Sequence, residues 1–318
     1  MTFTSFAYFI FLALVVGLYF LLPHKYRWIL LLVASAGFYM AFVPAYILIL
    51  GLTIVVDYAA GIFMERLEGR KRTGLLILSI VSTCAILFFF KYYDFASSIL
   101  TSAGEQLNKT WGLPPLDILL PIGLSFHTFQ SLSYIIEVYR GKQKAETHFG
   151  IYSLYVLFFP QLVAGPIERP QNMLHQFHET HTTNTQEWTE GLRRILWGLF
   201  KKVVIADRLA WSVNTVYAHP TEYTGLPLII ATICFAFQIY YDFSGYSDIA
   251  IGSARLLGFR LMENFRQPYG ARSIAEFWQR WHISLSSWLR DYIYIPLGGS
   301  RCSKPRTALN LLVTFLIS

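Results

Sequence analysis

The chain has 318 residues, of which 54% are hydrophobic and only 14% are charged. Soluble globular domains carry about 25% charged residues, so this composition excludes a free-standing cytosolic enzyme, a disordered chain and a coiled coil. The 26 lysines and arginines outnumber the 19 acidic residues and give a net charge of +7. Because the apolar residues gather in long runs, the sequence predicts an all-α polytopic membrane protein. Its basic excess is then expected in cytoplasmic loops and not on a nucleic-acid surface.

Five apolar runs occupy the first 136 residues, and we take residues 1–136 as the N-terminal transmembrane part of the chain. Each run is near the about 20 residues that cross a bilayer as a helix, although the second is short. The first run is neither preceded by a basic residue nor followed by a small-residue cleavage site, which favours a membrane anchor over a signal peptide. The runs are residues 5–22, 28–43, 45–63, 74–90 and 118–136.

The loops between these runs differ in charge from one side to the other. If the runs alternate across the membrane, residues 23–27, 64–73 and 137–149 share one side and contain nine lysines and arginines. The opposite side contains only Lys91 and Lys109. Basic loops stay in the cytoplasm, so we expect the N-terminus to be extracytoplasmic.

Apolar and charged segments alternate in residues 137–318, which we take as the motif-bearing region of one membrane-embedded domain, residues 1–318. Residues 150–164 are too short to span the bilayer and contain a proline, which favours a re-entrant segment. Residues 180–189 are polar and are expected to form a loop. Residues 191–216 interleave arginines and lysines with large apolar residues, a pattern typical of an amphipathic helix at the cytoplasmic surface.

The last residues, 308–318, form a short apolar run after a basic loop. A helix of this length reaches only about 16 Å, half of a bilayer. A helix that stopped there would leave carbonyl groups unsatisfied in lipid, so we expect the domain to be C-terminally incomplete.

Polar side chains separate two apolar segments, residues 226–241 and 249–259. Ionisable groups at membrane depth are energetically costly and usually face a cavity or a partner, so these side chains are candidates for lining a substrate path. The alternative is a polar loop at the interface, in which Asp248 caps a helix that starts near Ile249. The candidate residues are Asp242, Ser244, Tyr246 and Asp248.

A second polar group lies between Ser273 and Tyr292. Ser273 and Glu276 have capping-box spacing, which predicts a helix that begins at Ile274 and continues until Pro296 and the following glycines stop it. One face of that helix is aromatic and is most simply explained as packing. Another face carries a polar strip, which suggests the wall of a hydrated tunnel. The strip consists of Gln279, His282, Ser286 and Arg290.

His282 is the histidine best placed to take a proton. Imidazole has a pKa of about 6.5, so it can accept a hydroxyl proton at neutral pH, and a positioned base accelerates a reaction by about 10²–10⁴. The alternative is a hydrogen-bonded structural histidine. His127 lies inside the fifth apolar run and is a second candidate for the tunnel wall. The three cysteines and the other histidines lack convincing metal-ligand spacing, so we expect no bound metal.

Several segments resemble the membrane-bound O-acyltransferase family, and within it the bacterial alginate O-acetylase branch. The resemblance rests on residues 159–167, 241–248, 263–265 and 276–299, which include Tyr-Asp-Phe-Ser-Gly-Tyr-Ser-Asp and Trp-His-Ile-Ser-Leu-Ser. It implies a ring of tilted transmembrane helices around a central tunnel. It also implies an enzyme that takes an acyl group from a cytoplasmic thioester, acetyl-CoA being the expected donor, and delivers it to hydroxyls of an exported polysaccharide such as alginate.

The resemblance further implies a location in the bacterial inner membrane and a separate exported acetyltransferase partner. It gives His282 the role of an auxiliary histidine, because the principal histidine of the family lies in a Trp-His-Gly-like motif of the next transmembrane helix, beyond Ser318. We therefore expect residues 1–318 alone to be inactive. Two alternatives stay open. One is D-alanyl or other acyl transfer to teichoic acid or another envelope glycan, and the other is a transporter or channel without acyl chemistry.

Overall fold

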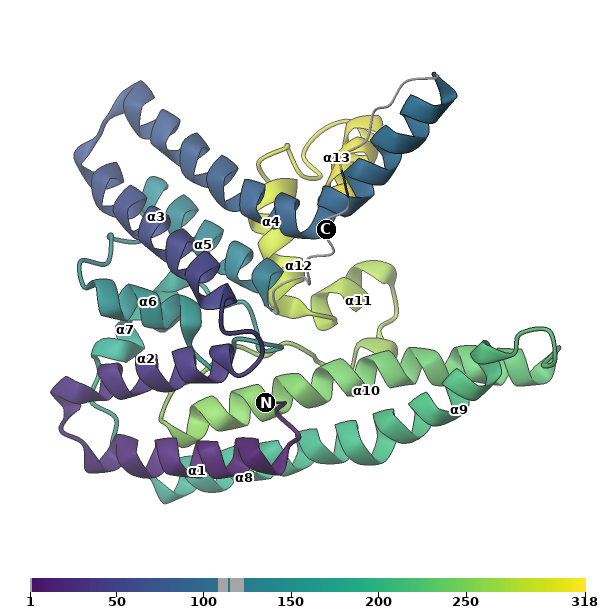
Figure 1. Cartoon of the computed structure of the whole chain (residues 1–318), viewed down its shortest axis with the longest axis horizontal. Helices are drawn as coiled ribbons and strands as arrows, with labels where there is room; N and C mark the ends of the chain where they lie inside the picture. The colour runs from purple at the N-terminus through teal and green to yellow at the C-terminus, as the bar shows by residue number, and fades with distance from the viewer. Residues whose placement is uncertain (1, 108–113, 115–122) are drawn as a thin grey trace. The chain divides into compact units, whose positions relative to one another are not determined.

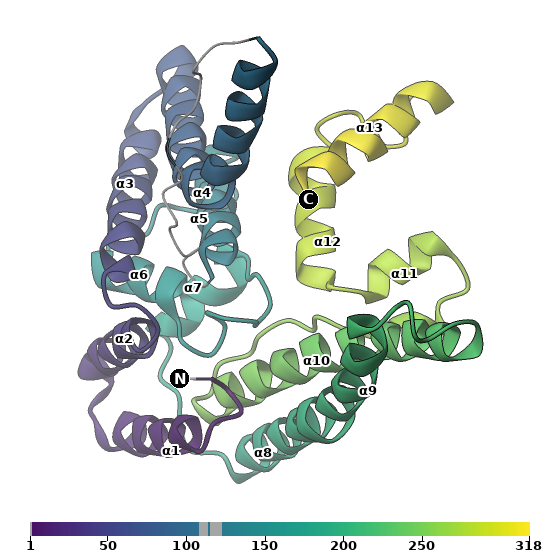
Figure 2. The same cartoon turned by 45° about the vertical axis from the view of Figure 1, so that its right-hand side comes forward.

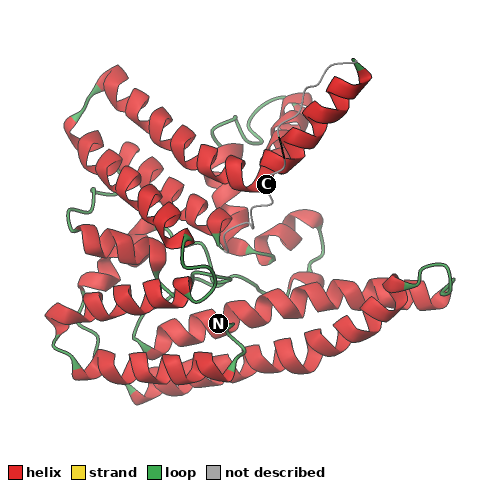
Figure 3. Ribbon diagram, in the orientation of Figure 1, coloured by secondary structure: helices red, strands yellow, loops and turns green. Residues whose placement is uncertain are grey.

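The computed structural model describes residues 2–107, 114 and 123–318. Over these ranges the regular secondary structure is helical, without a β-strand (Figure 3). A helix satisfies its backbone hydrogen bonds internally, which is why long apolar runs fold in this way. The all-α prediction is confirmed. The chain forms two compact units, one made of Met1–Arg27, Ala164–Glu168 and His178–Ser318, the other of Trp28–Val163 and Arg169–Phe177.

The second of these units is built around α5 (Leu124–Tyr139), which packs against α3 (Tyr46–Arg66) and α4 (Gly69–Gln106) (Figure 1). Both α3 and α4 are long and apolar enough to cross a membrane, as the third and fourth apolar runs predict. The fifth predicted run starts at residue 118, outside the described residues, and α5 contains its later part. The other helices here are α2 (His24–Met40), α6 (Phe149–Leu157) and α7 (Pro170–His178).

Asp57 lies inside α3 and is fully buried. Its carboxylate accepts hydrogen bonds from Ser79 Oγ at 2.7 Å and from Thr83 Oγ1 at 3.2 Å, both on α4. A buried carboxylate needs such donors, because a polar group without partners is costly in apolar surroundings. The two hydroxyls therefore explain how the third apolar run tolerates its acidic residue, and they join α3 to α4.

The first unit contains two long helical runs that lie side by side (Figure 2). One is α10 (Leu226–Leu256), whose 31 residues are apolar enough to span a membrane. The other consists of α8 (Thr185–Leu199), the π-helical segment η1 (Phe200–Ala206) and α9 (Asp207–Ala218), all in contact with α10. The remaining α-helices of this unit are α1 (Phe6–Leu21), α11 (Ile274–Arg280), α12 (Ile283–Leu289) and α13 (Lys304–Ile317).

Two pairs of glycines bring the backbones of α8 and α10 together. A Cβ on Gly198 would lie 2.6 Å from the carbonyl oxygen of Gly245, and a Cβ on Gly252 would lie 2.6 Å from that of Gly191. A side chain cannot occupy such a position when the neighbouring atom is backbone. Within each helix the two glycines are seven residues apart, so the close contact repeats after two turns. The glycine pairs thus hold the polar part of α10 against α8 and η1.

Gly198→Ala is expected to lower the free energy of unfolding by about 1–3 kcal/mol, because the added methyl group meets a carbonyl oxygen. Gly37→Ala is the matched control, since Gly37 lies inside α2 and a Cβ there meets nothing within 4 Å. Alanine favours a helix by up to about 1 kcal/mol over glycine, so the control should be as stable as the wild type or more stable. Thermal unfolding in detergent measures both variants, and equal stability of the two would contradict the close approach.

α10 continues without a break through residues 242–248, so the interpretation of this stretch as a polar loop with Asp248 as a helix cap is wrong. The reason is that Asp242 and Asp248 each pair with a lysine of η1. Side chains satisfied in this way do not compete with the helical backbone for its hydrogen bonds. The polar loop predicted over residues 180–189 is also shorter than expected, because α8 begins at Thr185.

The single helix predicted from Ile274 towards Pro296 is broken, and that prediction is wrong. The start is as expected, because the Ser273 hydroxyl accepts a hydrogen bond from the third residue of α11 at 3.1 Å. The break lies at His282, whose backbone is left-handed with φ of 41°. There the N–H of Ile283 donates to a carbonyl oxygen of the segment before α11, at 2.9 Å, and not to the preceding helical turn. The predicted polar strip is therefore divided between α11, the break, α12 and the π-helical turn after α12.

Candidate functional site

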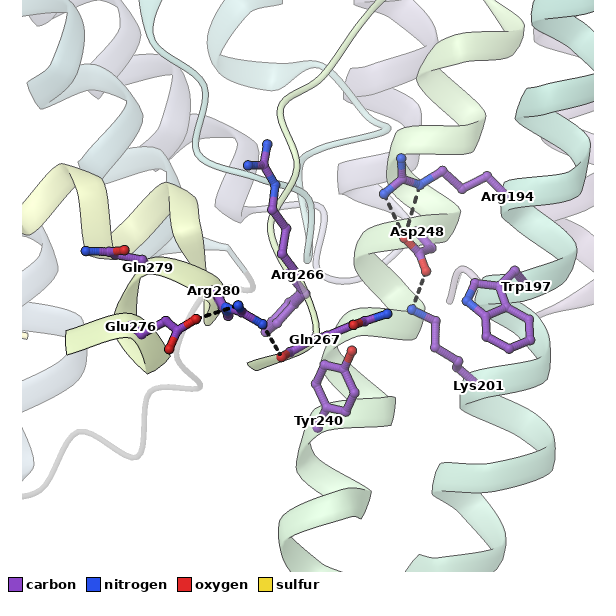
Figure 4. Close-up of a pocket in the computed structure, with 11 residues that line it drawn as sticks. Arg194, Trp197, Lys201, Tyr240, Asp248, Arg266, Gln267, Glu276, Gln279 and Arg280 are labelled. Atoms are coloured by element: carbon purple, nitrogen blue, oxygen red, sulfur yellow. Dashed lines mark hydrogen bonds and ion pairs between the residues drawn. The ribbon is translucent and has the colours of Figure 1, made fainter. Parts of the chain in front are cut away.

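Four charged side chains meet where α8 and η1 pack against α10, and Figure 4 shows three of them, Arg194, Lys201 and Asp248. Asp248 Oδ1 accepts hydrogen bonds from Arg194 Nε at 3.1 Å and Nη2 at 3.0 Å, and its Oδ2 pairs with Lys201 Nζ. Lys201 Nζ also lies 3.3 Å from Ser244 Oγ. Glu263 pairs with the same Arg194 guanidinium. The side chains of Lys201 and Asp248 are only 8% and 11% exposed, so water screens their attraction very little.

Helical spacing explains why these residues meet. Arg194 and Lys201 are seven residues apart and therefore lie two turns apart on one face of the same helical run. The π-helical turn of η1 lets two consecutive lysines reach different carboxylates of α10. Lys201 pairs with Asp248, whereas Lys202 Nζ lies 2.7 Å from Asp242 Oδ1.

Arg194 and Glu263 of this cluster stabilise each other's charged forms. Burial raises the pKa of the Glu263 carboxyl, but the hydrogen bond and positive charge of Arg194 outweigh burial, so the pKa lies below its ordinary value. Burial likewise lowers the pKa of Arg194, and its acidic partners Glu263 and Asp248 outweigh that effect and raise it. Arg194 and Glu263 therefore remain an ion pair throughout the neutral pH range.

A pocket of about 810 Å³ lies beside the cluster (Figure 4). Four cationic and two acidic side chains line it, together with aromatic and amide groups. This composition suits a negatively charged ligand that also carries a flat ring, because guanidinium groups bind phosphates and aromatic faces stack on rings. The lining residues are Arg194, Trp197, Lys201, Tyr240, Asp248, Phe265, Arg266, Gln267, Glu276, Gln279 and Arg280.

Two arginines of the pocket differ in their pairing. Arg280 Nη2 donates to Glu276 Oε1 at 2.5 Å, one turn away on α11. A backbone hydrogen bond from Arg272, aided by the charge of Arg280, lowers the pKa of the Glu276 carboxyl. The guanidinium of Arg266, in contrast, makes no side-chain hydrogen bond or ion pair within the described part of the chain. Arg266 is therefore available to an anionic ligand.

His282 lies at the break between α11 and α12, and three neighbours hold its ring. Its Nδ1 lies 3.1 Å from Asn264 Oδ1. The Phe243 ring meets it edge-on, with centroids 4.7 Å apart, and the ring of the pocket residue Phe265 lies nearly parallel at 6.4 Å. Burial lowers the pKa of His282 to about 4. The imidazole is therefore neutral at neutral pH and can accept a proton.

The structure brings some of the predicted tunnel residues to the pocket. Asp248 and Gln279 line it, and Ser244 contacts the pocket residue Lys201. Asp242 and Tyr246 are not among the lining residues. They face Lys202, whose Nζ lies 2.7 Å from Asp242 Oδ1 and 5.4 Å from the centre of the Tyr246 ring.

Three other predicted residues are not among those that line the pocket. Ser286 Oγ donates to the carbonyl oxygen of Trp281 at 2.9 Å, and Arg290 pairs with its neighbour Asp291 at 2.8 Å. His127 belongs to the other compact unit, where its Nδ1 donates to the carbonyl oxygen of Val156 at 3.1 Å. A role for these three residues in a tunnel stays a prediction.

The main cations of the pocket were not predicted from the sequence. Arg194 and Lys201 fit the polar face of a surface helix, whereas in the structure both side chains bind Asp248. A signal was present, because each cation follows a glycine, Gly191 or Gly198, by three residues and so shares the face that meets α10. Asn264 lies in the segment 263–265 that carries the resemblance, but no spacing pattern indicated its contact with His282, which joins residues 18 apart on either side of α11.

Comparison with known proteins identifies relatives of the chain. The family model of the membrane-bound O-acyltransferases matches residues 147–318. The chain is 42% identical over 315 residues to the probable alginate O-acetylase of Pseudomonas aeruginosa, which covers 97% of this chain and 59% of that protein. It is 34% identical over 316 residues to the peptidoglycan O-acetyltransferase of Helicobacter pylori, and this match covers 90% of this chain and 59% of that protein. It is 27% identical over 190 residues to the teichoic acid D-alanyltransferase of Bacillus subtilis, and this match covers 57% of this chain and 47% of that protein.

The chain thus spans about three fifths of the length of the two O-acetylating relatives. The stretch matched by the family model is more than half of the chain and contains the charge cluster, the pocket and His282. The resemblance read from the motifs is confirmed by these matches. The chain belongs to the membrane-bound O-acyltransferase family.

Proposed function

We propose that the whole protein is an O-acyltransferase that takes acetyl from acetyl-CoA in the cytoplasm and delivers it to hydroxyls of an exported polysaccharide such as alginate. The observation that carries the proposal is the cationic, aromatic pocket, which is joined through Phe265 to the neutral imidazole of His282. The names of the alginate and peptidoglycan relatives support acetyl as the acyl group. In this proposal the protein lies in the bacterial inner membrane with its N-terminus outside, and a separate exported acetyltransferase completes the transfer.

The pocket matches the chemistry of the proposed donor. Acetyl-CoA combines several phosphate charges with an adenine ring and a slender thioester arm. A guanidinium binds phosphate through two parallel hydrogen bonds, and Arg266 has its donors available. The faces of Trp197 and Tyr240 offer stacking surfaces for the base.

The proposed reaction needs no covalent intermediate on the enzyme. The acceptor hydroxyl oxygen attacks the thioester carbonyl carbon, a C–O bond forms, the C–S bond breaks, and the hydroxyl proton ends on the sulfur of CoA. Because a thioester is already activated, the protein must align the two reactants, accept a proton and exclude water. His282 takes the proton as the auxiliary histidine, beside the principal histidine expected beyond Ser318.

Arg266→Gln is expected to raise the KM for acetyl-CoA by roughly tenfold, because one charge-assisted contact to phosphate is lost. The KM for acetyl-pantetheine, which lacks the nucleotide phosphates, should stay unchanged. Arg260→Gln is the matched control, since Arg260 is exposed, pairs with Glu187 at 2.8 Å and does not line the pocket. Initial rates with the two donors measure the effect. An equal rise of both KM values would contradict phosphate binding by Arg266.

The proposed function is tested by expressing the whole protein with its neighbouring genes and supplying labelled acetyl-CoA to isolated membranes. Label in the exported glycan is the expected result. If only a D-alanyl carrier supplied label, the protein would be a D-alanyltransferase. The similarity to the teichoic acid D-alanyltransferase favours this alternative. Export of glycan with no acyl group from any donor would favour a transporter.

A further inference from the structure

Three hydrogen-bond donors converge on the side-chain oxygen of Asn264, which is 1% exposed. The backbone N–H of Ser284 lies 3.3 Å from Asn264 Oδ1, and the Ser284 hydroxyl donates to it at 2.9 Å. His282 Nδ1 is the third neighbour, at 3.1 Å. The buried amide thus connects the imidazole to the first turn of α12.

The backbone of Ser284 determines which way the Asn264 amide faces. A backbone N–H can only donate, so the atom that faces it must be the amide oxygen, because a rotated amide would place two donors against each other. The amide oxygen can only accept, so His282 Nδ1 must carry a proton. A neutral imidazole has one proton, so the lone pair is on Nε2.

We propose that Asn264 is a positioning residue for His282, holding the imidazole in the tautomer whose Nε2 can accept the proton of the acceptor hydroxyl. The identity of that proton rests on the proposed function. Within the described part of the chain Nε2 makes no hydrogen bond, so its lone pair is available to a substrate. Phe243 and Phe265 orient the ring but have no polar atom with which to select a tautomer.

Two other groups near the imidazole are weaker candidates for this role. Ser284 Oγ lies 3.4 Å from His282 Nδ1, at the outer limit of a hydrogen bond, and has its shorter contact with Asn264. The carbonyl oxygen of Asn264 accepts from the Ile283 N–H at 2.9 Å and is backbone, so a side-chain substitution keeps it. The side-chain oxygen of Asn264 can therefore be removed while the backbone contact at the break is retained.

Asn264→Leu removes this oxygen at nearly constant size. We expect kcat for acetyl transfer to fall by roughly 10- to 100-fold with the KM for acetyl-CoA unchanged, because the donor pocket keeps its lining. Asn264→Asp retains an acceptor and should recover most of kcat. Its negative charge raises the pKa of His282, so the acid limb of the pH–rate profile should move to higher pH. A kcat for Asn264→Leu equal to that of the wild type would overturn the proposal.

Ser284→Ala is the matched control, because it removes the hydroxyl donor to Asn264 Oδ1 and leaves the contact between Asn264 Oδ1 and His282 Nδ1. Its kcat should stay near that of the wild type. The His282→Gln background separates positioning from general support of the fold, since residues that act as a unit are non-additive. Asn264→Leu should lower the rate of His282→Gln no further. A further tenfold loss in that background would assign Asn264 a structural role and overturn the proposal.

The tautomer can also be measured without any assay of transfer. In ¹⁵N-histidine NMR of the whole protein, the His282 signals are those lost in His282→Gln. We expect a protonated Nδ1 and an unprotonated Nε2 in the wild type, and a mixture of tautomers in Asn264→Leu. A protonated Nε2 in the neutral wild-type ring would overturn the proposal even if acetyl transfer were intact. If the wild type failed to transfer acyl groups, the proposed function would be contradicted. The NMR test of the His282 tautomer would still be valid, because it does not depend on transfer.

Discussion

Asp248→Asn is expected to destabilise the protein by about 3–5 kcal/mol, because it leaves a buried cation without its carboxylate. Lys201 has only 8% of its side chain exposed, and its other polar neighbour is Ser244, at 3.3 Å. Arg194 loses less of its ion-pair stabilisation, since Glu263 still pairs with it. Thermal unfolding in detergent and the monodisperse fraction after purification measure the loss.

Two further variants test whether the stranded charge is the cause. Lys201→Met should be less harmful than Asp248→Asn, because Asp248 keeps Arg194 as a partner. The double variant should recover much of the loss, since replacing a whole buried ion pair is often nearly neutral. Glu222→Gln, in a pair that is mostly exposed, should change nothing measurable. A double variant as unstable as the sum of the single ones would show that the residues support the fold separately.

His282→Gln in the whole protein is expected to lower the rate of acetyl transfer by about 10²–10⁴, the usual contribution of a positioned acid–base group. Expression, membrane insertion and the KM for acetyl-CoA should stay normal, because His282 is not among the residues that line the pocket. His175→Gln, at an exposed position of α7, is the control and should keep full activity. Wild-type activity of His282→Gln would return His282 to a structural role.

The pH dependence of the wild-type rate provides a second check on His282. Burial lowers the pKa of His282 to about 4, and no charged group contributes to that shift. The ring therefore binds a proton only as the pH falls through about 4, and the part of the rate that depends on it should be level from pH 5 to 8. An acid limb at the ordinary imidazole pKa of about 6.5 would contradict the burial of this group in the working enzyme.

Local sequence patterns predicted the helices well where the helix depends on its own residues. The apolar runs within α3 and α4 and the cap at Ser273 are of this kind. The two wrong predictions of backbone course, at Asp248 and after Arg280, arose where a distant residue decides the backbone. The lysines of η1 pair with the aspartates of α10, which therefore stays helical through Asp248. The carbonyl oxygen of Asn264 accepts a hydrogen bond from the N–H of Ile283, which would otherwise have continued α11. Such partners cannot be read from spacing within one segment.

The candidate site was predictable only in part for the same reason. Asp248, Gln279 and His282 stood out as polar residues beside apolar or aromatic ones, and the structure places the first two in the pocket. Charge alone could not show that Arg194 and Lys201 face a carboxylate, because the same residues fit a surface helix equally well. Their roles depend on the packing of α8 against α10, which the glycine pairs determine.

Acetyl transfer across a sealed membrane distinguishes an acyltransferase from a transporter in one experiment. The whole protein and the proposed exported partner would be reconstituted in vesicles that enclose a polysaccharide acceptor, and labelled acetyl-CoA would be added outside. We expect label to reach the enclosed acceptor, at a rate that falls by at least about a hundredfold in His282→Gln. Passage of polysaccharide across the membrane without label would contradict the proposed acyl transfer. Acetyl transfer at the wild-type rate in His282→Gln would contradict the role of His282.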